Sequence, residues 1–239
     1  GSNSIARVSQ TGVVSTFSFT GATLNKPVGV AFAANGDLYV SNQGSGSTAD
    51  GSIIRITPQG VASVFATGLL APADIAFNGT DLFVTNSSGS GGTGVYRVTS
   101  AGVVSAYINN GIVTVPYGLA VAGNGDVYVG SGGNGRVSKK APTGQVSTFL
   151  ANGSLQSPMG MAFNGSDLYA AQSTSYTTSS IVKVASDRSI TTYATGLNTP
   201  SGLAFLMPAV AVPEPGSITL VALGGLAGAR LLRRRRAEA

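Results

Sequence analysis

The feature that most constrains this chain is a motif that recurs every 42 to 45 residues. Each copy is a proline, two residues of which the second is usually glycine, and an apolar run with a central alanine. The five copies are Pro27-VGVAF, Pro72-ADIAF, Pro116-YGLAV, Pro158-MGMAF and Pro200-SGLAF. A repeat of this length indicates one supersecondary unit that is used several times and buries its apolar faces against its neighbours.

Three more short runs follow the motif in its first four copies, and we name the four runs of a unit strands a to d. Strand b follows an Asn-Gly sequence, in the segments 35–40, 78–84, 124–129 and 164–170. Strand c is expected at 53–57, 95–99, 136–140 and 181–185, and strand d at 61–65, 103–107, 145–149 and 189–193. Asn-Gly between two apolar runs predicts a hairpin with a type I′ turn. Four antiparallel strands at this period are typical of one blade of a β-propeller.

The two ends of the chain supply complementary parts of a further unit. Residues 5–17 match strands c and d, and residues 200–205 match strand a. We therefore predict an all-β fold over residues 1–208, a five-bladed propeller whose last blade is closed by both termini. Strand b of that blade falls on residues 206–212, where Pro208 is unfavourable in the middle of a ladder. The alternative is a truncated six-bladed ring, and a β-sandwich would not explain copies that stay in phase.

Composition removes several classes of function. The chain has no Cys and no His, so it lacks thiolate chemistry and the usual general base near neutral pH. The formal net charge of +5 is concentrated in the tail, which predicts no nucleic-acid binding because such a surface needs a basic folded face. The chain begins GSNSIARVSQ, which has no apolar segment of a signal peptide. We expect the folded part to be a monomer.

Long connections predict where a ligand would bind. The b–c and d–a connections leave the same end of every blade, whereas the a–b and c–d turns at the other end are short. Asp50 lies in the longest b–c loop, and Asp74 replaces the glycine that every other Pro-x-Gly copy carries. With Tyr117 and Tyr176, these are the candidate residues of the binding face. Four other aspartates share one turn position in the repeat and are expected to be structural: Asp37, Asp81, Asp126 and Asp167.

The pattern Pro-x-Gly-[LVM]-Ala-[FV] followed by NGDLYV resembles the NHL-repeat propellers and the senescence-marker protein/gluconolactonase family. That family implies central metal ligands, Asn or Asp, at the middle position of Pro-x-Gly. The residues there are Val28, Ala73, Tyr117, Met159 and Ser201. A related streptogramin lyase relies on histidine, which is absent. The resemblance therefore implies a non-catalytic binding or scaffold module without a cofactor or catalytic residue. The alternative is a degenerate lactonase-like hydrolase that uses Asp74 or Asp50 and a divalent cation at the tunnel.

The tail has a composition of its own. VPEPGS at 212–217 is followed by an apolar run at 218–229 and by Arg230 and Arg233–Arg236. We expect a linker at 209–216, a transmembrane helix at 217–232 and a cytoplasmic tail at 233–239, because clustered positive charges stay in the cytoplasm. The residues that set this topology are Arg230, Arg233, Arg234, Arg235 and Arg236. The propeller then lies on the extracytoplasmic side.

The order of these tail features resembles the PEP-CTERM sorting signal of Gram-negative bacteria. The resemblance covers residues 212–236 and implies that a membrane exosortase recognises Pro213, Glu214 and Pro215 and cleaves near them. It also implies export to the cell envelope or the medium, where a polysaccharide or protein ligand would be met. The alternative is a plain C-terminal anchor with an incidental hinge.

Overall fold

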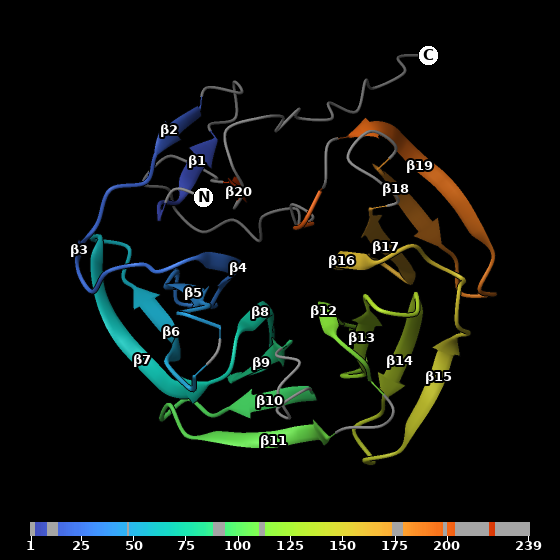
Figure 1. Cartoon of the computed structure of the whole chain (residues 1–239), viewed down its shortest axis with the longest axis horizontal. Helices are drawn as coiled ribbons and strands as arrows, with labels where there is room; N and C mark the ends of the chain where they lie inside the picture. Colours follow the sequence, from blue (N-terminus) through green and yellow to red (C-terminus); the bar gives the residue numbers. More distant parts are fainter. Residues whose placement is uncertain are drawn as a thin grey trace.

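The computed structural model describes residues 3–8, 14–46, 48–87, 94–109, 113–173, 179–197, 200–203 and 220–222. Within these ranges every regular element is a β-strand, and the strands form five sheets. Figure 1 shows the sheets arranged around a central axis in chain order. The predicted all-β propeller is therefore confirmed.

Four of the sheets are complete blades with strands a to d in sequence order. Blade 1 contains β4 (Pro27–Phe32), β5 (Leu38–Asn42), β6 (Gly51–Ile56) and β7 (Val61–Leu69). Blade 2 contains β8 (Pro72–Asn78), β9 (Asp81–Asn86), β10 (Gly94–Val98) and β11 (Val104–Asn109). Blade 3 contains β12 (Pro116–Val121), β13 (Val127–Ser131), β14 (Arg136–Lys140) and β15 (Val146–Leu150). Blade 4 contains β16 (Pro158–Asn164), β17 (Asp167–Gln172), β18 (Ser179–Val184) and β19 (Ile190–Leu197).

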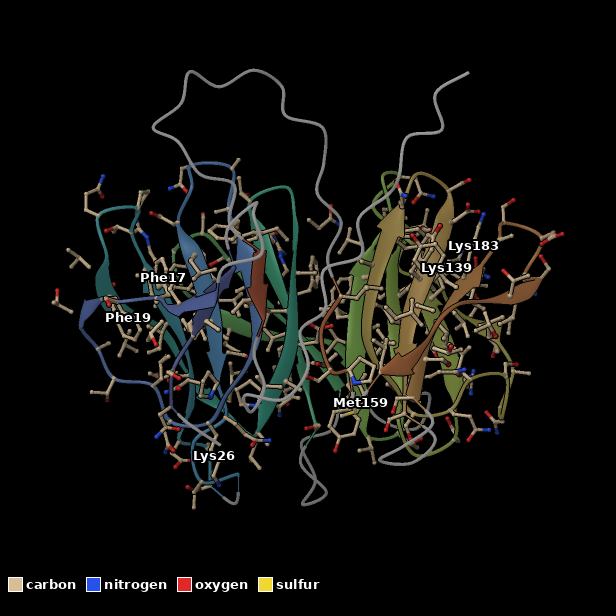
Figure 2. The ribbon with its side chains drawn as sticks, turned by 90° about the horizontal axis from the view of Figure 1, so that it is seen from above. Phe17, Phe19, Lys26, Lys139, Met159 and Lys183 are labelled. Carbon is tan, nitrogen blue, oxygen red and sulfur yellow. The ribbon has the colours of Figure 1, made fainter. Side chains whose placement is uncertain are left out.

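Strand a lies nearest the axis in each blade, and strand d forms the rim (Figure 1). A short strand, β3 (Thr20–Gly21), pairs in parallel with the outer edge of β7. Figure 2 shows that Lys26, at the start of strand a, and Lys139 and Lys183, on strands c, lie toward opposite ends of the ring. The d–a connections and the c–d turns therefore emerge on different faces, as predicted.

The Asn-Gly sequences form the predicted hairpins, but the predicted type I′ turn is wrong. In blades 1 and 3 the N–H of Gly36 and of Gly125 donates to the carbonyl three residues earlier at 2.9 Å, and the glycine φ is 87° and 84°. In blades 2 and 4 the glycine comes first in the turn, and Gly79 and Gly165 have a φ of 62°. In both arrangements, one glycine with positive φ is enough for the turn to follow the twist of the two strands that it joins. The asparagine is therefore not forced into positive φ.

Neighbouring blades enclose apolar clusters. Tyr39 lies edge-on to Phe65 and Phe77, with ring centroids 4.9 and 5.1 Å apart. Because Phe77 belongs to blade 2, these contacts join blade 1 to blade 2. Tyr128 has the same position between blades 3 and 4, 4.9 Å from the rings of Phe149 and Phe163. Edge-to-face aromatic pairs are favourable beyond the area they bury.

The four aspartates at the repeated turn position have the structural role that the sequence predicts. Each one forms an ion pair with a basic residue on strand c of its own blade. The pairs are Asp37–Arg55 at 2.6 Å, Asp81–Arg97 at 2.6 Å, Asp126–Lys139 at 3.1 Å and Asp167–Lys183 at 2.7 Å. In blades 1 and 3 the asparagine two residues earlier also donates to the carboxylate. These bonds fix the a–b turn against strand c.

The fifth sheet differs from the prediction in its inner half. Strands c and d are present as β1 (Ala6–Val8) and β2 (Val14–Thr16). The place of strand b is taken by β20 (Leu220–Ala222), which pairs antiparallel with β1. Residues 200–203, predicted as strand a, are not a strand, although they lie against β16. Residues 204–212 are outside the described residues.

Leu220–Ala222 lies inside the segment predicted as a transmembrane helix and is a strand here, because its backbone pairs with the edge of β1. The remainder of the predicted helix and the residues Pro213, Glu214, Pro215, Arg230 and Arg233–Arg236 lie outside the described residues. In the described part of the chain, no helix is long and apolar enough to cross a membrane.

Candidate functional site

The glycine of Pro-x-Gly marks the closest approach between neighbouring inner strands. A Cβ atom on Gly29 would lie 2.5 Å from the carbonyl oxygen of Ala73 and 2.9 Å from the Cα atom of Asp74. A Cβ atom on Gly160 would lie 2.8 Å from the Cα atom of Gly202. Real Cβ atoms do not come this close, so the backbone of each strand a rests directly on the next. Residues 200–203 therefore occupy the fifth inner position of the ring even though they are not a strand.

Asp74 is the exception at this position, and its carboxylate connects two blades. One oxygen, Oδ2, accepts a hydrogen bond from the backbone N–H of Leu119 in blade 3 at 2.8 Å. The other, Oδ1, accepts from the N–H of Ile75 at 3.0 Å. The side chain is partly buried. Burial raises the pKa of the Asp74 carboxyl to about 7, against the opposing effect of the two N–H donors.

Hydroxyl groups on strand b strengthen the same contacts. Ser41 Oγ accepts from the N–H of Gly29 at 2.7 Å and donates to the carbonyl of Ala73 in the next blade. Thr85 Oγ1 accepts from the N–H of Asp74 at 2.8 Å and donates to the carbonyl of Tyr117 at 2.9 Å. Neither hydroxyl is among the site residues predicted from the sequence. The sequence signal for them was that each directly precedes the asparagine at the end of strand b, in blades 1 and 2.

Polar ends of strand b also fix the long-loop face. Asn42, Asn86 and Gln172 each accept a hydrogen bond from a backbone N–H in the preceding d–a connection, at 2.5, 2.9 and 3.1 Å. The residue before the proline of every strand a has positive φ, between 43° and 55°, at Lys26, Ala71, Val115 and Ser157. Non-glycine residues rarely adopt this conformation. The long-loop face is thus a rigid rim around the axis.

Asp50 is used within its own loop. It is exposed, and its carboxylate accepts from the N–H of Ser45 at 2.9 Å and from the Ser45 hydroxyl at 3.0 Å. The backbone N–H of Ser45 lowers the pKa of the Asp50 carboxyl below its ordinary value. Asp50 belongs to a blade 1 loop and Asp74 to the inner strand of blade 2. No hydrogen bond or ion pair found among the described residues joins them.

Tyr117 lies on the long-loop face, half-buried. Its ring covers Gly132, where a Cβ atom would lie 2.5 and 2.8 Å from two ring carbons. The ring is therefore held in place by the backbone at the start of the b–c turn of blade 3. Tyr176, the other aromatic candidate, lies outside the described residues.

The residues present do not fit a lactonase-type metal centre. A hard divalent cation needs several oxygen ligands, usually including carboxylates. The described residues contain no group of three or more acidic, His or Cys side chains that could hold a metal. Both oxygens of Asp74 already accept backbone hydrogen bonds. No reaction step through a metal follows from this arrangement.

Two hollows in the surface lie at the short-turn end of the blades. One of about 270 Å³ is lined by Asn124, Tyr128, Phe163 and Ser166, near the short turns of blades 3 and 4. Another of about 350 Å³ lies between residues 15–18 and 58–60. Both are shallow, so they do not have the shape of an enclosed active site.

Comparison with known proteins supports the two predicted resemblances. Residues 211–236 match the PEP-CTERM protein-sorting motif, so the chain carries this motif. The motif indicates export with sorting by exosortase and an extracytoplasmic location. A search of curated proteins returned no significant match.

Three solved structures with a similar fold are distant in sequence from this chain. Virginiamycin B lyase from Staphylococcus aureus is 18% identical with a TM-score of 0.61, over 85% of this chain and 67% of the lyase. A nidogen/laminin complex is 16% identical with a TM-score of 0.66, over 83% of this chain and 80% of that chain. A gluconolactonase from Xanthomonas campestris is 18% identical with a TM-score of 0.59, over 71% and 62%. The chain spans about two thirds of the length of the lyase and the gluconolactonase. These likenesses confirm the propeller fold and no more than the fold.

Proposed function

We propose that the exported propeller is a non-catalytic binding or scaffold module, displayed at the surface of a Gram-negative cell or released into the matrix. Its partner is a polysaccharide or a protein, which it meets with the long-loop face. The observation that carries this proposal is the use of Asp74. The carboxylate on the inner strand of blade 2 connects this blade to blade 3 through the backbone N–H of Leu119, and its other oxygen accepts from the N–H of Ile75.

The rim around Asp74 also favours binding over catalysis. Among the middle positions of Pro-x-Gly, Val28, Tyr117 and Met159 are partly exposed and offer apolar and aromatic contact, Ala73 is buried, Ser201 carries a hydroxyl, and none is a carboxylate. The d–a connections that precede blades 1, 2 and 4 are held in place, because a backbone N–H in each donates a hydrogen bond to the Asn or Gln at the end of strand b. Rigid scaffolds that carry loops are the usual architecture of recognition surfaces.

A binding screen tests the proposal. The processed protein, purified from an exosortase-bearing host, is passed over arrays of envelope polysaccharides and surface proteins. Tyr117→Ala and Asp50→Lys are expected to weaken binding at least about tenfold. Ser166→Lys, on the opposite face, is the matched control and should leave binding unchanged. Binding that responds to Ser166→Lys and not to the first two variants would contradict the assignment of the face.

We also propose that exosortase recognises Pro213, Glu214 and Pro215 and cleaves the chain near them. Both prolines restrict φ and favour an extended backbone, which suits a peptide read by an enzyme. Replacing the three residues with alanine should abolish processing, measured as a mass shift of the mature protein. Unchanged processing would instead support a plain membrane anchor.

A second candidate is a degenerate lactonase-like hydrolase, favoured by one observation. A carboxyl with a pKa of about 7 is suited to proton transfer near neutral pH. Lactone hydrolysis by the purified protein with added Ca²⁺ or Mn²⁺, lost in Asp74→Asn, would establish this function. Absence of hydrolysis across a lactone panel would leave the binding role.

A further inference from the structure

Strand c of blade 3 departs from the repeat on the face that packs against the preceding blade. In each strand c, three side chains lie on this face. The strand b residues with which they pair show which positions correspond between the blades. The strand c residues are Ser52, Ile54 and Ile56 in blade 1, Gly94, Tyr96 and Val98 in blade 2, Arg136, Ser138 and Lys140 in blade 3, and Ser180, Val182 and Val184 in blade 4. Among these four blades, only blade 3 has polar side chains at all three of these strand c positions.

The change alters the contact between blades 2 and 3. The apolar clusters of the other contacts include strand c residues such as Val98 and Val184. The cluster between blades 2 and 3 contains Val127 and Val129 of strand b but no residue of β14. On the blade 3 side, this contact is therefore apolar at strand b and polar at strand c, whereas blade 2 contributes apolar residues out to strand d, such as Ile108.

Three donors in the polar part have buried atoms without a hydrogen-bond partner among the described residues: Ser131 Oγ, Ser138 Oγ and Arg136 Nε. Both serines are fully buried, at 0% exposure. Ser131 is directly opposite Arg136 in the register, and Ser138 follows Arg136 by two residues on the same side. Opposite side chains of antiparallel strands have Cβ atoms about 5 Å apart. The three groups therefore lie close together on one side of the blade.

Two basic side chains lie in the polar part of this contact, Arg136 and Lys140. One terminal nitrogen of Arg136 donates to Thr148 Oγ1, and the ammonium group of Lys140 donates to the carbonyl of Tyr107 at 2.5 Å. The Lys140 nitrogen also lies 3.9 Å from the centre of the Tyr107 ring. Neither cation has an ion-pair partner among the described residues, although Lys139 between them is paired with Asp126. Partly buried cations and orphaned donors are unfavourable unless an acceptor joins them.

We propose that the contact between blades 2 and 3 is a binding site for a small oxyanion, held by Arg136 Nε–H and the hydroxyls of Ser131 and Ser138. A carboxylate or sulfate-like group supplies the acceptors that all three donors lack, and a guanidinium is suited to such anions. The half-exposed Arg136 lies at the b–c turn, so the anion would enter from the long-loop face. The site does not depend on the proposed surface partner.

Thermal unfolding of the full chain in mild detergent tests the site. Sodium sulfate and sodium acetate are titrated against sodium chloride at equal ionic strength, because an anion that binds only the native state raises the midpoint in a saturable way. Arg136→Gln should weaken the apparent affinity about tenfold or more. Arg188→Gln, which removes one charge at the c–d turn of blade 4, where Arg188 lies against the Phe149 ring on the other side of blade 3, is the matched control and should respond like the wild type. Equal anion responses in Arg136→Gln and the wild type, or no saturable response to either anion, would overturn the proposal.

Ser138→Val provides a second test if Arg136→Gln does not fold, since Val182 occupies the equivalent position in blade 4. The proposal expects a several-fold weaker response to the anion with a midpoint that is unchanged or higher in its absence. A higher midpoint with an intact anion response would mean that the hydroxyls are a packing defect filled by water. The Nε–H resonance of Arg136 gives a direct readout. It should shift with saturation during the acetate or sulfate titration, and an unmoved resonance would exclude the contact.

Discussion

The contact between blades 1 and 2 and the contact between blades 2 and 3 use the same repeat positions and fill them differently. In the contact between blades 1 and 2, Gly29 lets the backbone of β4 lie directly against the backbone of Asp74. In the contact between blades 2 and 3, the carboxylate of Asp74 accepts a hydrogen bond from the backbone N–H of Leu119. Toward the rim, apolar Val98 is replaced by Lys140. The backbone pairing within the blades is kept in both. A propeller can therefore exchange apolar packing for polar groups at one contact without a change of fold.

The largest expected effect is on the apolar contact. Tyr39→Ala removes the ring between Phe65 and Phe77 and should lower the free energy of unfolding by about 3–5 kcal/mol. Urea titration followed by circular dichroism measures it. Tyr39→Phe keeps the ring and should cost less than about 1 kcal/mol. A small loss for Tyr39→Ala would mean that aromatic packing does not hold blades 1 and 2 together.

The close approach of the inner strands gives the next effect. Gly29→Ala places a Cβ atom 2.5 Å from a carbonyl oxygen and should cost about 3 kcal/mol, measured by the same titration. Gly202→Ala is the control, because no heavy atom lies within 4 Å of its added Cβ, and it should change stability by less than about 1 kcal/mol. Equal losses in the two variants would show that glycine is needed at Gly29 for another reason.

Asp74→Asn tests whether the carboxylate at the contact between blades 2 and 3 is unfavourable when charged. The pKa of Asp74 is raised by burial to about 7, so the native state binds more protons than the unfolded state between about pH 4 and pH 7. Stability of the wild type relative to Asp74→Asn should therefore fall as pH rises through this window. The shift corresponds to about 4 kcal/mol for a fully buried group, and solvent screening at this partly exposed side chain reduces the expected change to about 2 kcal/mol.

Comparing unfolding titrations of the two proteins at pH 4.5 and pH 7.5 isolates this contribution from the other carboxylates. A difference that does not change with pH would show that Asp74 titrates normally.

The smallest effect concerns the ion pair between the a–b turn and strand c, which blade 1 and blade 2 each contain. Asp81→Asn should cost only about 0.5 kcal/mol, because Asp81 and Arg97 are both solvent-accessible. Asp37 is buried and also accepts from Asn35, so Asp37→Asn should cost about 2 kcal/mol. If the two losses are equal, burial does not govern these pairs.

The sequence was sufficient for the parts of the fold that recur. Proline spacing and Asn-Gly turns predicted four blades and their strand order, and a shared turn position identified Asp37 and its equivalents as structural. The inner half of the fifth sheet was not predictable, because an apolar run such as 218–229 suits a helix or a strand equally by periodicity. The role of Asp74 depended on how closely the next blade approaches, which no spacing within one unit reveals.

The polar face of β14 shows what a unit-by-unit comparison can add. Arg136, Ser138 and Lys140 alternate in the sequence, which is an ordinary pattern for an exposed strand. Only the registers of all four blades show that these positions face a neighbouring blade, and that the positions of Ser138 and Lys140 carry apolar or aromatic residues in the other three blades.

Pairing of β1 with β20 sets an order on the folding of this ring. Each of the four blades is built from one continuous segment, so its strands can pair as soon as that segment is available. The fifth sheet joins residues 6–8 to residues 220–222 and has the greatest sequence separation of any pairing in the described structure. Such long-range pairing carries a large loop-closure cost and forms late. The four blades can therefore form before β20 pairs with β1, and the proposed cleavage near Pro-Glu-Pro would separate β20 from the propeller.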